Sequence, residues 1–166
     1  TEHSIDAASF ADLRERRAAI NVFFRSLAAN HGDGYAIVLS GGGSDGALGA
    51  RAAKESGGVV LVQDPQEALH SAMPRSVIAA DVADVVLPVK DIARRLAELV
   101  QQRRTLAPLI ADPQLPNPEH DEAGLRRILD LLRARTGHDF TRYKRPTIVR
   151  RLGRRMELRH RPSLDD

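Results

Sequence analysis

A single carboxylate stands among glycines near the middle of the chain, in the stretch Gly-Gly-Gly-Ser-Asp-Gly at 41–46. An apolar run, "YAIVLS", comes directly before it, and an alanine-rich stretch that suits a helix follows it. α/β proteins usually keep their catalytic groups in such strand-to-helix loops, at the carboxyl edge of a parallel sheet. Asp45 is therefore a candidate for a group that does chemistry.

Two other interpretations of this loop stay open. Gly41, Gly43 and Gly46 fit the G-x-G-x-x-G pattern of dinucleotide-binding loops, and Asp64 ends the next apolar run, where a ribose-binding acid would be sought. Asp45 argues against a nucleotide, because its carboxylate would compete with the pyrophosphate for the positive end of the helix. The third interpretation is structural, with Asp45 as a cap of the helix that follows it.

Composition indicates a globular chain of one domain, or of one domain and part of another. The 166 residues are 42% hydrophobic and contain no cysteine, which excludes disulfides and thiolate chemistry. No run of about 18 apolar residues exists, and the polar N-terminus lacks a signal-peptide pattern. We expect a soluble, cytoplasmic protein without membrane insertion and without a metal site.

Apolar runs and helical spacing predict the α/β fold class, with a partial open parallel sheet and flanking helices. Three apolar runs predict strands, at 35–40, 59–63 and 85–89. Helical patterns predict helices at 20–27, at 44–55 with Ser44 as the cap, and at 92–100. The helical crossover between the first two strands implies that they are parallel.

A proline-rich stretch divides the chain. Four of the nine prolines fall within it, at positions 108, 113, 116 and 118. We predict a linker at 105–120, between a partial α/β domain at 1–104 and an all-α segment at 121–166. The charge also changes there, since residues 121–166 hold 13 lysines and arginines against seven acids, whereas residues 1–120 hold 12 against 15.

Phrases in register across residues 20–101 resemble the chemotaxis protein-glutamate methylesterases, the CheB type. The phrases are "FFRSLA", "IVLSGGGSDGALGARAAKESGG", "VLVQDPQEA", "MPRSVIA" and "VLPV". In that family the loop aspartate completes a Ser-His-Asp triad that hydrolyses receptor glutamyl methyl esters. The resemblance implies that Asp45 is the triad acid and that the N–H of Gly42 lies at the oxyanion position. Residues 1–18 resemble no family convincingly.

The serine and histidine of that triad lie well upstream of the aspartate in the family. Only 44 residues precede Asp45, and they contain no glycine-flanked serine turn. His31 suits a helix end beside Gly32 better than catalysis. We therefore expect no methylesterase activity from this chain alone, as a piece of a longer protein or a degenerate esterase. Its open sheet edge favours a homo-oligomer.

The last third of the chain is helical and basic. One apolar stripe predicts a helix that ends at Thr136-Gly137, and Pro146 suits the first turn of another helix that runs to about Arg159. At about 100° per residue, that last helix has an apolar side and a cationic side. The apolar side is formed by Ile148, Val149, Leu152 and Met156, and the cationic side by Arg150, Arg151, Arg154 and Arg155.

Residues 125–166 resemble the start of the helical N-terminal domain of the chemotaxis receptor methyltransferases, the CheR type. The resemblance rests on a "GxDFxxYK" turn and an "RRLxRRM" helix. In that family the arginine-rich helix faces acidic receptor helices, which implies receptor binding by Arg150, Arg151, Arg154, Arg155, Lys144 and Arg145. No cofactor is expected in this chain, because the domain that binds S-adenosylmethionine would follow Asp166.

Methylesterase followed by methyltransferase is the order found in hybrid chemotaxis signalling proteins. We interpret the chain as an internal piece of such a hybrid, with receptor docking or scaffolding as its role and chemoreceptor-like proteins with methylatable glutamates as partners. The alternative is an arginine-rich nucleic-acid-binding module, whose affinity for duplex DNA would fall steeply with salt.

Overall fold

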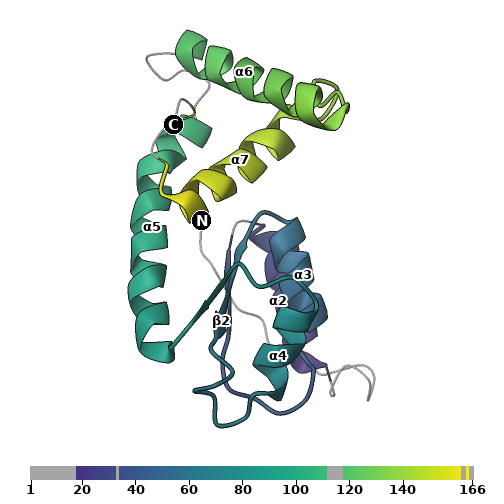
Figure 1. Ribbon diagram of the computed structural model, residues 1–166, viewed down its shortest axis with the longest axis vertical. Helices are drawn as coiled ribbons and strands as arrows, with labels where there is room; N and C mark the ends of the chain where they lie inside the picture. The colour runs from purple at the N-terminus through teal and green to yellow at the C-terminus, as the bar shows by residue number, and fades with distance from the viewer. Residues whose placement is uncertain (1–17, 33, 112–117, 162–163, 165–166) are drawn as a thin grey trace. The chain divides into compact units, whose positions relative to one another are not determined.

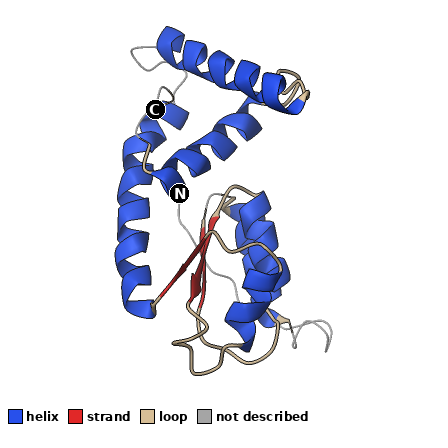
Figure 2. Cartoon of the chain, in the orientation of Figure 1, coloured by secondary structure: helices blue, strands red, loops and turns tan. Residues whose placement is uncertain are grey.

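The computed structural model describes residues 18–32, 34–111, 118–161 and 164, with the backbone alone at 105–111 and 118–121. The chain divides into two compact units, Thr1–Val89 and Lys90–Asp166, each of which is considered by itself (Figure 1). The first unit combines strands with helices, and the part of the second unit that the structure describes is helical (Figure 2).

Three parallel strands form the sheet of the first unit, in the order β1-β2-β3. Their bounds are Tyr35–Val38, Val59–Gln63 and Val85–Leu87. Helices α3, Ala47–Glu55, and α4, Ala72–Ala79, form the crossovers that parallel pairing requires. The predicted fold class is confirmed, although the sequence pattern did not predict α4.

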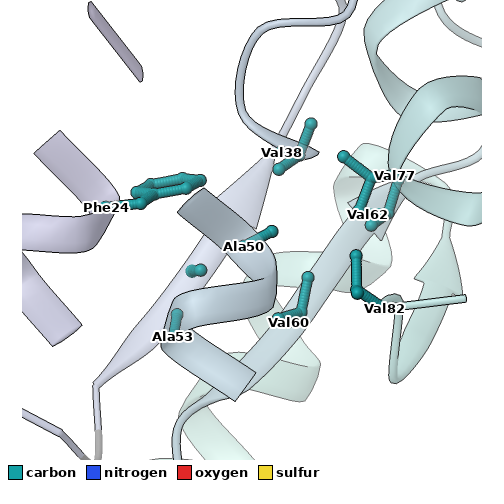
Figure 3. Packing of buried hydrophobic residues seen from close by; sticks show 9 residues of the cluster. Phe24, Val38, Ala50, Ala53, Val60, Val62, Val77 and Val82 are labelled. Carbon is teal, nitrogen blue, oxygen red and sulfur yellow. The ribbon is translucent and has the colours of Figure 1, made fainter. Parts of the chain in front are cut away.

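The core of the first unit lies between the sheet and helices α2, α3 and α4 (Figure 3). Strand β2 is buried along its whole length, as expected for the central strand of a parallel sheet. Helix α2, Ala19–Asn30, occupies the segment predicted as helical. Of its apolar residues, Phe24 enters the core, whereas the side chain of Phe23 is 51% exposed.

The second unit contains helices α5, Val89–Ala111, which begins at the unit boundary, α6, Pro118–Thr136, and α7, Arg145–Arg159. Helix α7 has Pro146 in its first turn and ends at Arg159, as predicted. Helix α5 continues into the stretch expected as a linker, and residues 112–117 of that stretch lie outside the described residues. Within the described ranges, no helix is both long and apolar enough to cross a membrane.

Candidate functional site

The glycine loop joins the end of β1 to the start of α3. Its last residue, Gly46, has φ 105°, and this left-handed residue is the N-cap of α3. No side chain of the loop bonds to the first turn of that helix, so the prediction that Ser44 caps it is wrong. The left-handed turn at Gly46 leads the chain directly into the helix at Ala47, a conformation that glycine adopts without strain.

The half-buried carboxylate of Asp45 bonds to helix α2. Its Oδ2 accepts from the N–H of Ile20 at 2.9 Å, and its Oδ1 accepts from the N–H of Asn21 at 3.1 Å. Both donors belong to the first turn of α2, whose N–H groups have no partner within the helix. The structural interpretation is therefore corrected, because Asp45 caps α2 and not α3.

Asn21 makes the reciprocal contact to α3. Its side-chain Oδ1 accepts from the N–H of Gly46 at 3.1 Å and from the N–H of Gly49 at 2.7 Å. These are N–H groups that a dinucleotide-binding loop would offer to a pyrophosphate, which argues against that alternative. The sequence pattern did not indicate a role for Asn21, whose only signal was a polar side chain between apolar ones.

The start of the loop pairs with the segment that precedes α4. Gly41 donates its N–H to the carbonyl of His70 at 2.9 Å and accepts from the N–H of Met73 at 3.1 Å. The N–H of His70 also donates to Ser40 Oγ at 2.9 Å. Gly42 follows this pairing, is exposed, and has no atom within 4 Å of an added Cβ. Its N–H lies on an accessible part of the loop, and its oxyanion role stays a prediction.

His31 lies far from the carboxylate of Asp45. Asp45 binds the first turn of α2, whereas His31 is the C-cap residue of the same helix, as predicted for a histidine at a helix end. About 16 Å of helix separates Ile20 from His31, given the rise of 1.5 Å per residue. The structure does not bring these two candidate groups together.

Helix α7 exposes most of the predicted cationic side. Arg150, Arg151 and Arg155 are exposed, and Arg154 is half-buried and has a partner. Lys144, the N-cap residue of the helix, is exposed as well. The structure therefore places exposed positive charge along α7, in the second unit, while the glycine loop belongs to the first.

Arg145 is exposed at the start of α7 and pairs with a carboxylate of α6. Its Nη2 lies 2.8 Å from Oε2 of Glu122. Exposed ion pairs of this kind contribute about 0–1 kcal/mol, so this pair leaves Arg145 able to bind another anion.

The most buried charged group of α7 is Glu157, at 2% exposure. Its Oε2 accepts from Nε of Arg103 at 3.2 Å and from Nη2 of Arg103 at 2.9 Å. Gln102 adds a bond to the carbonyl of Met156 at 3.3 Å. Helix α5 thus holds α7 by a buried ion pair, which the sequence indicated only by a lone acid within a basic helix.

A carboxylate also shapes the turn before α7. Asp139 Oδ1 accepts from the hydroxyl of Thr141 at 2.6 Å and from its N–H at 3.0 Å. These two bonds, the hydroxyl first, hold the pKa of the Asp139 carboxyl below its ordinary value. The stabilisation is therefore present above the ordinary pKa and is lost as the pH falls through the lowered value.

The Thr141→Val substitution should raise the pKa of Asp139 toward its ordinary value, because it removes the hydroxyl donor. A carbon-13 NMR titration of the Asp139 carboxyl measures this change. Thr136→Val is the matched control, since the Thr136 hydroxyl bonds the carbonyl of Leu132 at 2.7 Å and does not donate to Asp139. An equal shift in both variants would contradict the assignment.

Comparison with known families confirms both resemblances, in the predicted order. A family model described as CheB methylesterase matches residues 3–96, and one described as CheR methyltransferase, all-alpha domain, matches residues 123–166. The expectation that residues 1–18 resemble no family is corrected, because the first match begins at residue 3.

Similar proteins include an uncharacterized 104.1 kDa protein of Rhodobacter capsulatus, 36% identical over 92% of this chain and 18% of its own length. A protein-glutamate methylesterase/protein-glutamine glutaminase of Nocardioides sp. is 43% identical over 55% of this chain and 26% of its own length. This chain thus spans about a quarter or less of these two curated relatives.

A solved structure, the Thermotoga maritima CheB methylesterase catalytic domain, shares 36% sequence identity with this chain. It covers 46% of this chain and 41% of its own, with a TM-score of 0.45. The CheB model alone spans more than half of the 166 residues. The chain therefore belongs to the CheB methylesterase family, and a CheR-type all-alpha domain follows its methylesterase segment.

Proposed function

We propose that these 166 residues are a receptor-docking module of a chemotaxis receptor-modification protein. The observation that carries this proposal is the exposed arginine surface of α7, formed by Arg150, Arg151 and Arg155 within the CheR-type match. Glu157, the one acid of that helix, is buried against Arg103, so it adds no negative charge to this exposed surface. Acidic receptor helices with methylatable glutamates are the proposed partner, since complementary charge favours association.

Three further basic residues lie near the exposed arginines of α7 in the sequence. Lys144 and Arg145 extend the positive charge to the start of α7, and the half-buried Arg154 directly precedes the exposed Arg155. We assign these three residues to the edge of the docking surface.

For the methylesterase part, we propose that Asp45 is the triad acid and that Gly42 offers its N–H to an oxyanion. Each carboxylate oxygen of Asp45 binds one N–H of α2 and retains a lone pair for an imidazole. A triad acid alone cannot transfer an acyl group, because the serine and the histidine carry out the chemistry. We therefore propose that these residues by themselves do not hydrolyse methyl esters.

We propose that S-adenosylmethionine, which the CheR-type family implies for a full methyltransferase, is not bound by the described residues of α6 and α7. Glu157, the buried carboxylate of α7, is already bonded to Arg103, and Asp130 and Asp139 are exposed. No step of the proposed function involves this cofactor.

The sheet supports a further proposal about partners. Among the described strands, β1 and β3 each pair on one side only, with β2. Unpaired strand edges favour association, so a homo-oligomer that covers one of them is our proposed assembly.

Replacing the arginine surface should weaken receptor binding by at least about tenfold at low salt. The test variant is Arg150→Gln/Arg151→Gln/Arg155→Gln, and binding to an acidic helical peptide with methylatable glutamates is measured by fluorescence anisotropy. The matched control is Arg25→Gln/Arg75→Gln/Arg126→Gln, which removes the same net charge from exposed positions elsewhere. Equal losses in the two triple variants would contradict a specific surface on α7.

Duplex DNA in the same assay tests the alternative function. Tighter binding to DNA than to the peptide, with a steep dependence on salt, would favour a nucleic-acid module.

A separate assay tests catalysis. It measures methanol release from a methylated receptor fragment and compares the unchanged chain with the Asp45→Ala variant. Activity that depends on Asp45 would contradict the proposal that the chain alone is inactive.

A further inference from the structure

The N-terminal ends of α2 and α3 are joined by hydrogen bonds that run in both directions. Asp45, at the start of α3, accepts from the backbone of Ile20 and Asn21. The side chain of Asn21, in α2, accepts from the backbone of Gly46 and Gly49. Each helix thus supplies the side chain that binds the first N–H groups of the other, whereas an ordinary cap acts within one helix.

The two helices also approach each other closely, side by side on the same face of the sheet (Figure 1). A Cβ added at Gly49 would lie 2.9 Å from Cα of Asn21 and 2.7 Å from Cβ of Phe24. A Cβ added at Gly46 would lie 3.1 Å from Cγ2 of Ile20. The glycines therefore allow the short distances that the reciprocal bonds require.

We propose that Asn21 is a positioning residue for the Asp45 carboxylate. Its side chain does not bond to that carboxylate but holds the first turn of α3, and so fixes the end of the loop that carries Asp45. The N–H groups of Ile20 and Asn21 then hold one oxygen each, which fixes the plane of the carboxylate. This inference concerns the glycine loop, and it holds whether or not α7 binds a receptor.

Amide hydrogen exchange in the full chain, followed by NMR, tests the inference. Asn21→Ala should accelerate exchange about tenfold at Gly46 and Gly49, whose acceptor it removes. It should also accelerate exchange at Ile20 and at position 21, whose N–H groups the Asn21 side chain does not touch. Asn21→Asp keeps an oxygen acceptor and should restore protection at all four positions.

Asn30→Ala is the matched control, because it removes the same side chain from the same helix. The Asn30 side chain bonds only locally in the described contacts, to the carbonyl of Ser26 at 2.9 Å, so the four amides should keep their protection. Faster exchange at Gly46 and Gly49 with full protection at Ile20 and position 21 would overturn the inference, since it would show a one-way cap.

A measurement on the unchanged chain covers the case in which Asn21→Ala does not fold. Scalar couplings across hydrogen bonds are expected from the Gly49 nitrogen to Cγ of Asn21 and from the Ile20 nitrogen to Cγ of Asp45. Detection of both supports the reciprocal arrangement. Detection of the first without the second overturns it.

Discussion

Gly58→Ala should destabilise the first unit by about 3 kcal/mol, at the upper end of the usual cost of overpacking. A Cβ at this position would lie 2.4 Å from the carbonyl oxygen of Gly34 and 2.9 Å from that of Ala53. Both oxygens already accept a backbone hydrogen bond, the Gly34 carbonyl from the N–H of Val59 and the Ala53 carbonyl from the N–H of Gly58. The strand, the helix end or both must move to admit a methyl group.

Hydrogen exchange at the amides of β2 measures this cost without interference from the second unit. Gly42→Ala is the matched control, because an added Cβ there meets no atom within 4 Å. Its effect on β2 should stay within about 0.5 kcal/mol. Equal exchange rates in the two variants would show that the turn before β2 adapts to a methyl group.

Arg103→Ala should weaken the attachment of α7 to α5 by about 3 kcal/mol. The side chain of Glu157 is 3% exposed and accepts two bonds from the guanidinium of Arg103, whose own side chain is 22% exposed. Removal of one partner of a buried ion pair leaves a charge in a poorly solvated position, which is expensive. Exchange at the amides of α7 should therefore accelerate by about a hundredfold.

A double variant separates the cost of removing Arg103 from a buried carboxylate from the value of the ion pair itself. Arg103→Met/Glu157→Leu replaces both groups by apolar side chains of similar size, and such replacements are often neutral or stabilising. It should therefore be more stable than Arg103→Ala. A double variant as unstable as Arg103→Ala would mean that α7 depends on the ion pair itself.

Much of the fold could be predicted because its signals are local. The apolar runs of β1, β2 and β3, and the helical crossover between β1 and β2, are each contained in a few residues, and they imply parallel pairing. Helix α7 has Pro146 in its first turn and ends at Arg159, as the sequence pattern predicted. Helix α4 escaped prediction because its short sequence contains proline and has no long apolar period.

The candidate site was predicted only in part. The glycine loop and the family to which it belongs follow from residues adjacent in the chain, and so does the run of arginines in α7. The helix that Asp45 caps could not be predicted in this way, because a capping signal in sequence points to the helix that follows the capping residue. The structure instead pairs Asp45 with the first turn of α2, where Ile20 lies 25 residues upstream.

The sequence by itself determined the strands, their parallel direction, the glycine loop and the positive side of α7, because each depends on the composition and period of one segment or of one crossover. Only the tertiary structure decided that Asp45 and Asn21 cap each other's helices, that Gly58 must lack a side chain, and that Glu157 is buried against Arg103. Apart from the approach of Gly58 to Ala53, these contacts join groups from 24 to 54 positions apart. Periodicity reports which side of an element is apolar, but the atoms that meet that side are supplied by another part of the chain.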